Sequence, residues 1–110
     1  MRRGDIYFAD LNPTVGSEIN KKRPVLIISN DANNIGSATI TILPITSNVT
    51  KIYPFEVALA ATAGLSKASK IQCQQIRTIS KLRIIKKRIG RIDSHILNQV
   101  DNALKLHLGF

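Results

Sequence analysis

Arg23 follows two lysines and is separated only by Pro24 from the apolar run Val25–Ile28, so it falls where a polar loop meets a buried strand. A guanidinium stays charged and donates two parallel hydrogen bonds, which suits the paired oxygens of a phosphodiester. RNA carries its own nucleophile, the 2′-hydroxyl, and an enzyme can cut the chain by holding that oxygen in line with phosphorus and neutralising the developing charge. Arg23 is therefore a candidate phosphate ligand, although a solvated charge at a strand entry is the more common role.

Hydroxyl and amide side chains supply two further groups of candidates. Thr46 and Ser47 follow an expected strand, where a hydroxyl can bond a phosphate oxygen or orient a proton, but where ordinary turn formation is the simpler explanation. Gln74, Gln75 and Arg77 carry donors and acceptors that can read base edges, or they form an exposed strand face.

The residues that usually bind metals or attack substrates are scarce and scattered. His95 and His107 are twelve residues apart in an expected helix, which is about 18 Å along its axis and too far to share a metal. Cys73 is the only cysteine and is more typical of a small buried hydrophobic residue than of a nucleophile. Glu18 and Asp31 are the carboxylates near loop ends. We expect no metal and no cofactor.

The charge balance indicates the kind of partner. Sixteen Lys and Arg against seven Asp and Glu give a formal net charge of +9, which attracts nucleic acids, anionic membranes or acidic proteins. The longest strongly apolar run, Val25–Ile28, is far too short to span a bilayer. A single cysteine fits a reducing cytoplasm. We expect one domain over residues 1–110, cytoplasmic, with no membrane partner.

Several strands are needed to position these side chains. Periodicity and turn residues predict strands over residues 5–11, 25–28, 38–45, 55–60 and 69–80, the last with an interruption at Gln74 and Gln75. Residues 12–22 and 30–36 are predicted as loops. Residues 81–92 fit neither the strand nor the helix period, and their six basic side chains extend an RNA-binding track or face solvent.

The C-terminal segment predicts one helix. Asp93 or Ser94 can cap it, and Gly109 suits its end. A stripe at helical spacing gives it an apolar face, and its members are Ile96, Leu97, Val100, Ala103, Leu104 and Leu108. The fold class is therefore mostly β with a C-terminal helix packed on a small barrel or twisted sheet.

Five short motifs occur in an order that resembles a known family. They are Arg3-Gly4-Asp5-Ile6-Tyr7, Leu11 to Glu18 (LNPTVGSE), Arg23 to Asp31 (RPVLIISND), Ile45-Thr46-Ser47 and Gln75 to Ile79 (QIRTI). Each motif alone is weak, but together they extend over essentially the whole chain. The sequence resembles the MazF/PemK family of toxin–antitoxin endoribonucleases.

This resemblance implies an SH3-like β-barrel of the MazF/CcdB type, a homodimer, and sequence-specific cleavage of single-stranded RNA without a metal. It implies a 2′,3′-cyclic phosphate, or the derived 3′-phosphate, and a 5′-hydroxyl as the new ends. It also implies an antitoxin of the MazE type whose acidic or extended tail covers the RNA groove. Arg23 and Thr46 match the catalytic Arg and Thr of the family. Ser17, Glu18, Ser47, Gln75 and Arg77 match positions that line its RNA path.

The chain departs from the family in two places. Many relatives have Gly-rich residues between Glu18 and Arg23, where this chain has Ile19-Asn20-Lys21-Lys22, and Lys21 is accordingly an additional candidate phosphate contact. Relatives often have Glu where this chain has Gln74; an amide donates as well as accepts, so the base preference is expected to differ. The cleavage sequence of a relative is therefore not transferable.

Two other functions are compatible with the same composition. A CcdB-type gyrase poison shares the fold but depends on a C-terminal Trp, and this chain contains no Trp. A basic RNA-binding module without catalysis would retain RNA in a salt-dependent way and leave it uncut.

Overall fold

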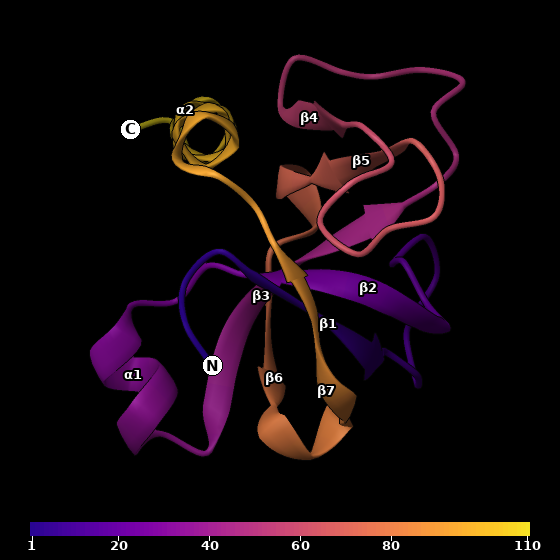
Figure 1. Ribbon diagram of the computed structural model, residues 1–110. Coiled ribbons are helices and arrows are strands. Elements are labelled where there is room, and N and C mark those ends of the chain that lie inside the picture. Colours follow the sequence, from indigo (N-terminus) through magenta and orange to yellow (C-terminus); the bar gives the residue numbers. More distant parts are fainter.

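Seven strands and two helices make up the computed structural model, which describes residues 1–110 (Figure 1). In chain order they are β1 (Asp5–Asp10), β2 (Lys22–Ile27), α1 (Asp31–Gly36), β3 (Thr39–Thr46), β4 (Glu56–Leu59), β5 (Ser69–Gln72), β6 (Arg77–Ser80), β7 (Ile84–Arg91) and α2 (Ser94–Leu108), with short 3₁₀ turns η1 (Cys73–Gln75) and η2 (Lys81–Arg83). The predicted class, mostly β with a C-terminal helix, is confirmed.

The long strand β3 joins the two parts of the sheet. One of its edges pairs with β2, and its other edge pairs first with β6 and then, at Ile45 and Thr46, with β5. The remaining order is β4-β5-β3-β2-β1-β7, and every pairing is antiparallel. The sheet curls in the manner of a small barrel, but this hydrogen-bonded path does not close on itself.

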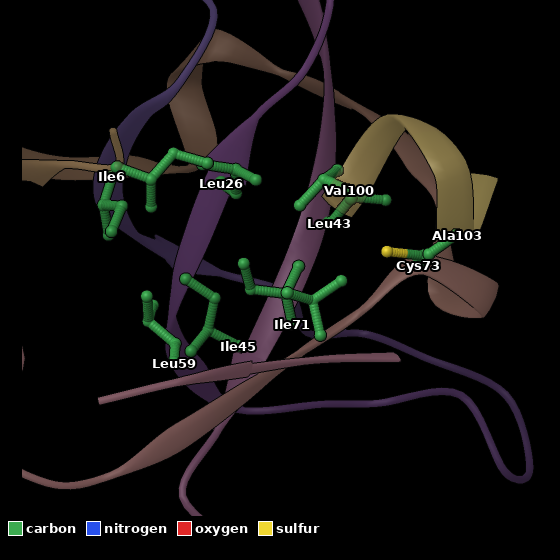
Figure 2. Packing of buried hydrophobic residues seen from close by; sticks show 11 residues of the cluster. Ile6, Leu26, Leu43, Ile45, Leu59, Ile71, Cys73, Val100 and Ala103 are labelled. Carbon is green, nitrogen blue, oxygen red and sulfur yellow. The ribbon is translucent and has the colours of Figure 1, made fainter. Parts of the chain in front are cut away.

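Side chains from β2 and β3 fill a separate core on each face of the sheet. Leu26 and Leu43 belong to the core that α2 covers with Val100 and Ala103, as Figure 2 shows. Their neighbours Val25 and Ile27 alternate to the opposite face and a second core. A strand buried on both faces is apolar at every position. This explains the uninterrupted run that predicted β2.

The helix α2 begins and ends as its sequence predicts. The carboxylate of Asp93 accepts a hydrogen bond from the backbone N–H of Ile96 at 2.9 Å, and Gly109 ends the helix with φ +78°. Leu108, predicted to lie on the apolar stripe, is instead 44% exposed. Neither helix has the length and hydropathy needed to cross a membrane.

Residues 30–36, predicted as a loop, contain α1. Asn30 caps this helix by accepting a hydrogen bond from the N–H of Asn33 at 2.8 Å, and Asn34 is buried with its amide donating to the carbonyl of Ser29. The amide side chains that signal a loop therefore stabilise one short helix instead.

The two segments after residue 68 also differ from expectation. The predicted strand 69–80 is two strands, β5 and β6, separated by η1 at the predicted interruption. Residues 84–91 form β7, which the sequence pattern did not reveal. Ile6 pairs with Gly90 whereas Phe8 pairs with Ile85, so β7 bulges between them, with Lys86 at φ +64°. The bulge breaks the alternation that identifies a strand.

Two glycines allow the β4–β5 connection to lie against β7. A Cβ on Gly64 would lie 1.8 Å from the carbonyl oxygen of Ile89, and a Cβ on Gly90 would lie 1.5 Å from that of Ala63. Because both obstacles are backbone, no side-chain movement relieves the overlap. We call this contact the glycine interlock, and it fixes the position of residues 60–68 relative to the sheet.

Candidate functional site

Arg23 and Thr46 meet because β2 and β3 are paired in register. Val25 faces Pro44 across the two strands, and continuing this antiparallel register places Arg23 across from Thr46. Nη1 of Arg23 donates to Oγ1 of Thr46 at 3.3 Å. The sequence placed these two residues 23 positions apart, and the pairing brings them together as the resemblance implied.

Two backbone groups orient the pair. Nε of Arg23 donates to the carbonyl oxygen of Asn20 at 2.7 Å, and Oγ1 of Thr46 also accepts from the N–H of Asn48 at 3.2 Å. Nη2 of Arg23 bonds no protein group, and the hydroxyl proton of Thr46 is left to donate because its oxygen already accepts twice. Both groups can therefore donate to an oxyanion. Sequence reasoning missed Asn20 and Asn48, since each contributes through its backbone and any residue type could do so.

Arg23 lines a groove of about 530 Å³ with a one-sided charge; Thr46 is buried and does not line it, although its chain neighbours Ile45 and Ser47 do. Four cations line it and no carboxylate does: Lys21, Lys22, Arg23 and Lys67. Ser47, one of the predicted site residues, lines the same groove. Unopposed cations in a concave site concentrate the potential that attracts a phosphate backbone.

A smaller pocket of about 170 Å³ contains most of the other predicted residues. Glu18, Gln74, Gln75 and Arg77 line it. Residues 18–24 connect the two sites, since this segment contributes first to the small pocket and then to the groove. The structure therefore divides the predicted RNA path into a cationic groove and an amide-rich pocket.

Arg77 and Gln75 hold the polar loop between β1 and β2. Nη1 of Arg77 donates to the carbonyl of Leu11 at 2.9 Å, and Oε1 of Gln75 accepts from the N–H of Ile19 at 3.4 Å. Each of these side chains supports one end of the loop that leads to Arg23. Ser17, at the tip of that loop, is exposed and lines neither pocket.

Gln74 lines the small pocket, but its amide nitrogen points inward. It donates to Oε2 of the buried Glu56 at 2.7 Å, and its amide oxygen is buried without a hydrogen-bond partner. Lys70 donates to the other Glu56 oxygen at 2.9 Å. Burial alone would raise the pKa of Glu56, but hydrogen bonds from Gln74, the Tyr53 N–H and Lys70 outweigh it and lower that pKa. Gln74 thus stabilises the interior.

Most basic side chains of residues 81–91 bind protein groups. Lys81 donates to the carbonyl of Asn34, and Arg83 donates to the carbonyls of Asp10 and Asn12. Arg88 and Arg91 both bind the carboxylate of Asp5. These four cations have structural roles. The expectation that basic side chains of this segment face solvent is confirmed for Lys86, Lys87, Arg88 and Arg91, which are exposed.

Asp5 is nearly inaccessible, with its side chain 3% exposed. Burial alone would raise its pKa, but hydrogen bonds from the Arg2 N–H, Arg91 and Arg88 outweigh that effect and lower the pKa. The carboxylate connects the start of β1 to the end of β7.

The remaining reactive residues lie away from the groove. Cys73 is fully buried, and burial, with the nearby charge of Glu56, raises the pKa of its thiol to about 12. The prediction that Cys73 is a small buried hydrophobic residue is confirmed. His95 and His107 are exposed on α2, as predicted. No three His, Cys, Asp or Glu side chains lie close enough together to bind a metal.

Comparison with known proteins gives consistent matches. A sequence profile described as PemK-like, MazF-like toxin of type II toxin-antitoxin system matches residues 2–108. The chain is 47% identical to "Endoribonuclease MazF9" of Mycobacterium tuberculosis over 98% of this chain and 96% of that one. It is 43% identical to "Endoribonuclease EndoA" of Bacillus subtilis over 98% and 94%. A MazE-MazF crystal structure from Deinococcus radiodurans superimposes with a TM-score of 0.80 at 27% identity, covering 100% of this chain and 96% of that one.

Proposed function

Since the chain belongs to the PemK-like and MazF-like toxins of type II toxin–antitoxin systems, we propose that it cuts single-stranded RNA in the groove beside Arg23. Both named relatives are endoribonucleases, which favours cleavage over gyrase poisoning or RNA binding without catalysis. The observation that carries the proposal is the contact between Arg23 and Thr46 at the edge of a groove with four cations and no carboxylate.

The reaction uses a nucleophile that the substrate supplies. The 2′-oxygen attacks the adjacent phosphorus as it loses its proton, and the bond from phosphorus to the 5′-oxygen breaks. The 5′-oxygen leaves and gains a proton, giving a 2′,3′-cyclic phosphate and a 5′-hydroxyl. In the transition state, negative charge accumulates on the non-bridging oxygens of the phosphate, and preorganised hydrogen-bond donors lower the energy of this state.

The two catalytic candidates have different tasks in this scheme. The free Nη2 of Arg23 donates to a non-bridging oxygen, and the Asn20 carbonyl prevents the guanidinium from turning away. Thr46 donates its remaining proton to a second oxygen, because its own oxygen accepts from Arg23 and Asn48. Lys21 and Ser47 hold the flanking backbone. Glu18, Gln75 and Arg77 shape the path beyond the loop, with Ser17 at its exposed tip.

Three features of the protein's setting belong to the same proposal. It acts as a homodimer, which light scattering would report as twice the chain mass of 12.1 kDa. A MazE-type antitoxin with an acidic segment covers the groove, in line with the net charge of +9 and with the MazE-MazF neighbour. The toxin works in the cytoplasm, where a lone thiol stays reduced.

The test is cleavage of a long single-stranded RNA in excess EDTA, with the new ends mapped. We expect discrete cuts with 5′-hydroxyl ends, and at least a 100-fold slower reaction for Arg23→Ala, about the cost of losing one preorganised donor. Arg2→Ala is the matched control because that side chain is exposed and lies outside the groove. Undiminished cleavage by Arg23→Ala would refute the site. Two unrelated transcripts left intact by the wild type would refute the activity.

A further inference from the structure

One wall of the groove comes from a segment to which sequence reasoning assigned no role. Residues 64–67, in the connection between β4 and β5, line it together with Ser69. The glycine interlock holds this segment against β7, and the N–H of Leu65 donates to the carbonyl of Thr62 at 2.9 Å. A wall that backbone contacts already fix loses little conformational entropy when a ligand binds to it.

Lys67 is the only cation on that wall. Its ammonium group makes no ion pair and no hydrogen bond to the protein, whereas its backbone carbonyl accepts from the hydroxyl of Ser69 at 3.0 Å. No carboxylate lines the groove to neutralise it. The side chain is therefore free to bind an anion, and Arg23 lines the same groove from β2.

Phe8 provides the complementary apolar surface. It lies on β1 opposite Pro24 of β2, directly beside the Arg23 position, and its side chain lines the groove while 40% of the residue is exposed. An exposed ring in a cationic groove is the arrangement on which single-stranded bases stack. The volume of 530 Å³ lies within the range of about 300–1,000 Å³ of small-ligand sites.

From this geometry we propose a nucleotide subsite next to the cleavage site: Lys67 binds an RNA phosphate adjacent to the one held by Arg23, and Phe8 stacks with a base. The proposal rests on the proposed function, because it assumes that RNA is the occupant of the groove. It assigns binding, and no chemical step, to both residues.

Salt dependence of binding tests the role of Lys67. The probe is a fluorescent RNA of the mapped cut sequence with a 2′-deoxy nucleotide at the cut, which lacks the nucleophile. Each phosphate contact with a single strand contributes about 0.7 to the slope of log K against log salt. We expect Lys67→Met to bind about three- to tenfold more weakly, with a slope lower by about 0.7. In cleavage assays KM rises and kcat is unchanged.

Lys87→Met is the matched control, since Lys87 is exposed on β7 and lines neither the groove nor the small pocket. Its affinity and slope should equal those of the wild type. Identical affinity and slope for Lys67→Met would overturn the phosphate contact. If Lys67→Met is unchanged while the wild type cuts RNA, only the subsite is refuted. If the wild type neither binds nor cuts RNA, the proposed function itself is refuted.

Phe8 is tested by two substitutions of different kinds. Phe8→Leu keeps apolar volume but removes the ring, and should weaken binding about tenfold with an unchanged salt slope. Phe8→Tyr keeps an aromatic ring and should bind the RNA with the affinity of the wild type. Urea midpoints confirm that each variant is folded. Equal affinity of the folded Leu and wild-type proteins, or failure of Tyr to restore binding, would overturn the stacking contact.

Discussion

Two clusters of cations in this protein have similar composition and opposite surroundings. The groove cluster, Lys21, Lys22, Arg23 and Lys67, faces a concave space with no carboxylate. The structural cluster, Lys81 and Arg83 of η2 with Arg88 and Arg91 of β7, donates to backbone carbonyls and to the buried Asp5. In the sequence, residues 21–23 and residues 81–91 look alike, since each is a basic segment. What separates a binding surface from a structural one is whether the protein itself already satisfies the charge.

The two clusters are connected through the loop between β1 and β2. Arg83 donates to the carbonyls of Asp10 and Asn12, and Arg77 donates to the carbonyl of Leu11 between them. These arginines hold the start of the loop that ends at Arg23. The structural cluster thus contributes to the groove indirectly, by fixing the segment that carries its central charge.

Among the substitutions that separate the two clusters, Thr46→Val should have the largest effect, and it acts on activity alone. The substitution keeps the shape but removes the proton that we assign to the phosphate, so kcat should fall about 100-fold with little change in the urea midpoint. Thr41→Val is the control on the same strand, since its hydroxyl bonds only Thr78, at 3.0 Å. Equal kcat values for Thr46→Val and Thr41→Val would contradict the catalytic role assigned to the groove.

Asp5→Asn should lower stability and leave activity unchanged, the opposite of Thr46→Val. It weakens the bonds from Arg88 and Arg91 to a buried carboxylate, and because both arginines are partly exposed we expect a loss of about 2 kcal/mol in the free energy of unfolding. The kcat of the folded protein should be unchanged. Asp101→Asn, at a more exposed ion pair with Arg3, should cost under about 1 kcal/mol. A large fall in kcat at full stability would contradict a structural assignment.

Acid should weaken two buried carboxylate sites in a graded way: Asp5, which binds the structural cluster, and Glu56, which binds Lys70 and Gln74. The pKa values of Asp5 and Glu56 are lowered in the folded state, so the unfolded chain binds more protons below about pH 5. This contribution is complete above the unfolded pKa values and is lost as pH falls through the folded ones. Urea midpoints should therefore decline from pH 5 to 3, less steeply in Asp5→Asn. A flat profile would mean that these carboxylates do not contribute.

Periodicity predicted those parts of the fold in which a single pattern persists. The apolar run from Val25 and the helical stripe after Asp93 each gave an element of the right type, and both helix ends were correct. The bulge at Lys86 concealed β7, and the Asn-rich sequence before Gly36 concealed α1. In both places local geometry outweighs the pattern that composition suggests.

The catalytic candidates could be recognised, but their surroundings could not. Arg23 and Thr46 were identified from their residue types and motifs, and strand register brought them together. The inward bond of Gln74 depends on Glu56, which is distant in sequence. Phe8 and Lys67 join the groove through tertiary packing alone, and no local signal in the sequence marks them.

The glycine interlock has a practical consequence for altering RNA preference. Gly64 and Gly90 anchor the β4–β5 connection by backbone contacts, and Leu65 packs against the core, whereas Ser66, Lys67 and Ala68 are exposed. Residues 66–68 can therefore be randomised as a cassette, with both glycines and Leu65 retained, and the library screened for altered cleavage sequences. The same feature divides the connection into a segment that must be kept and one that is open to directed evolution.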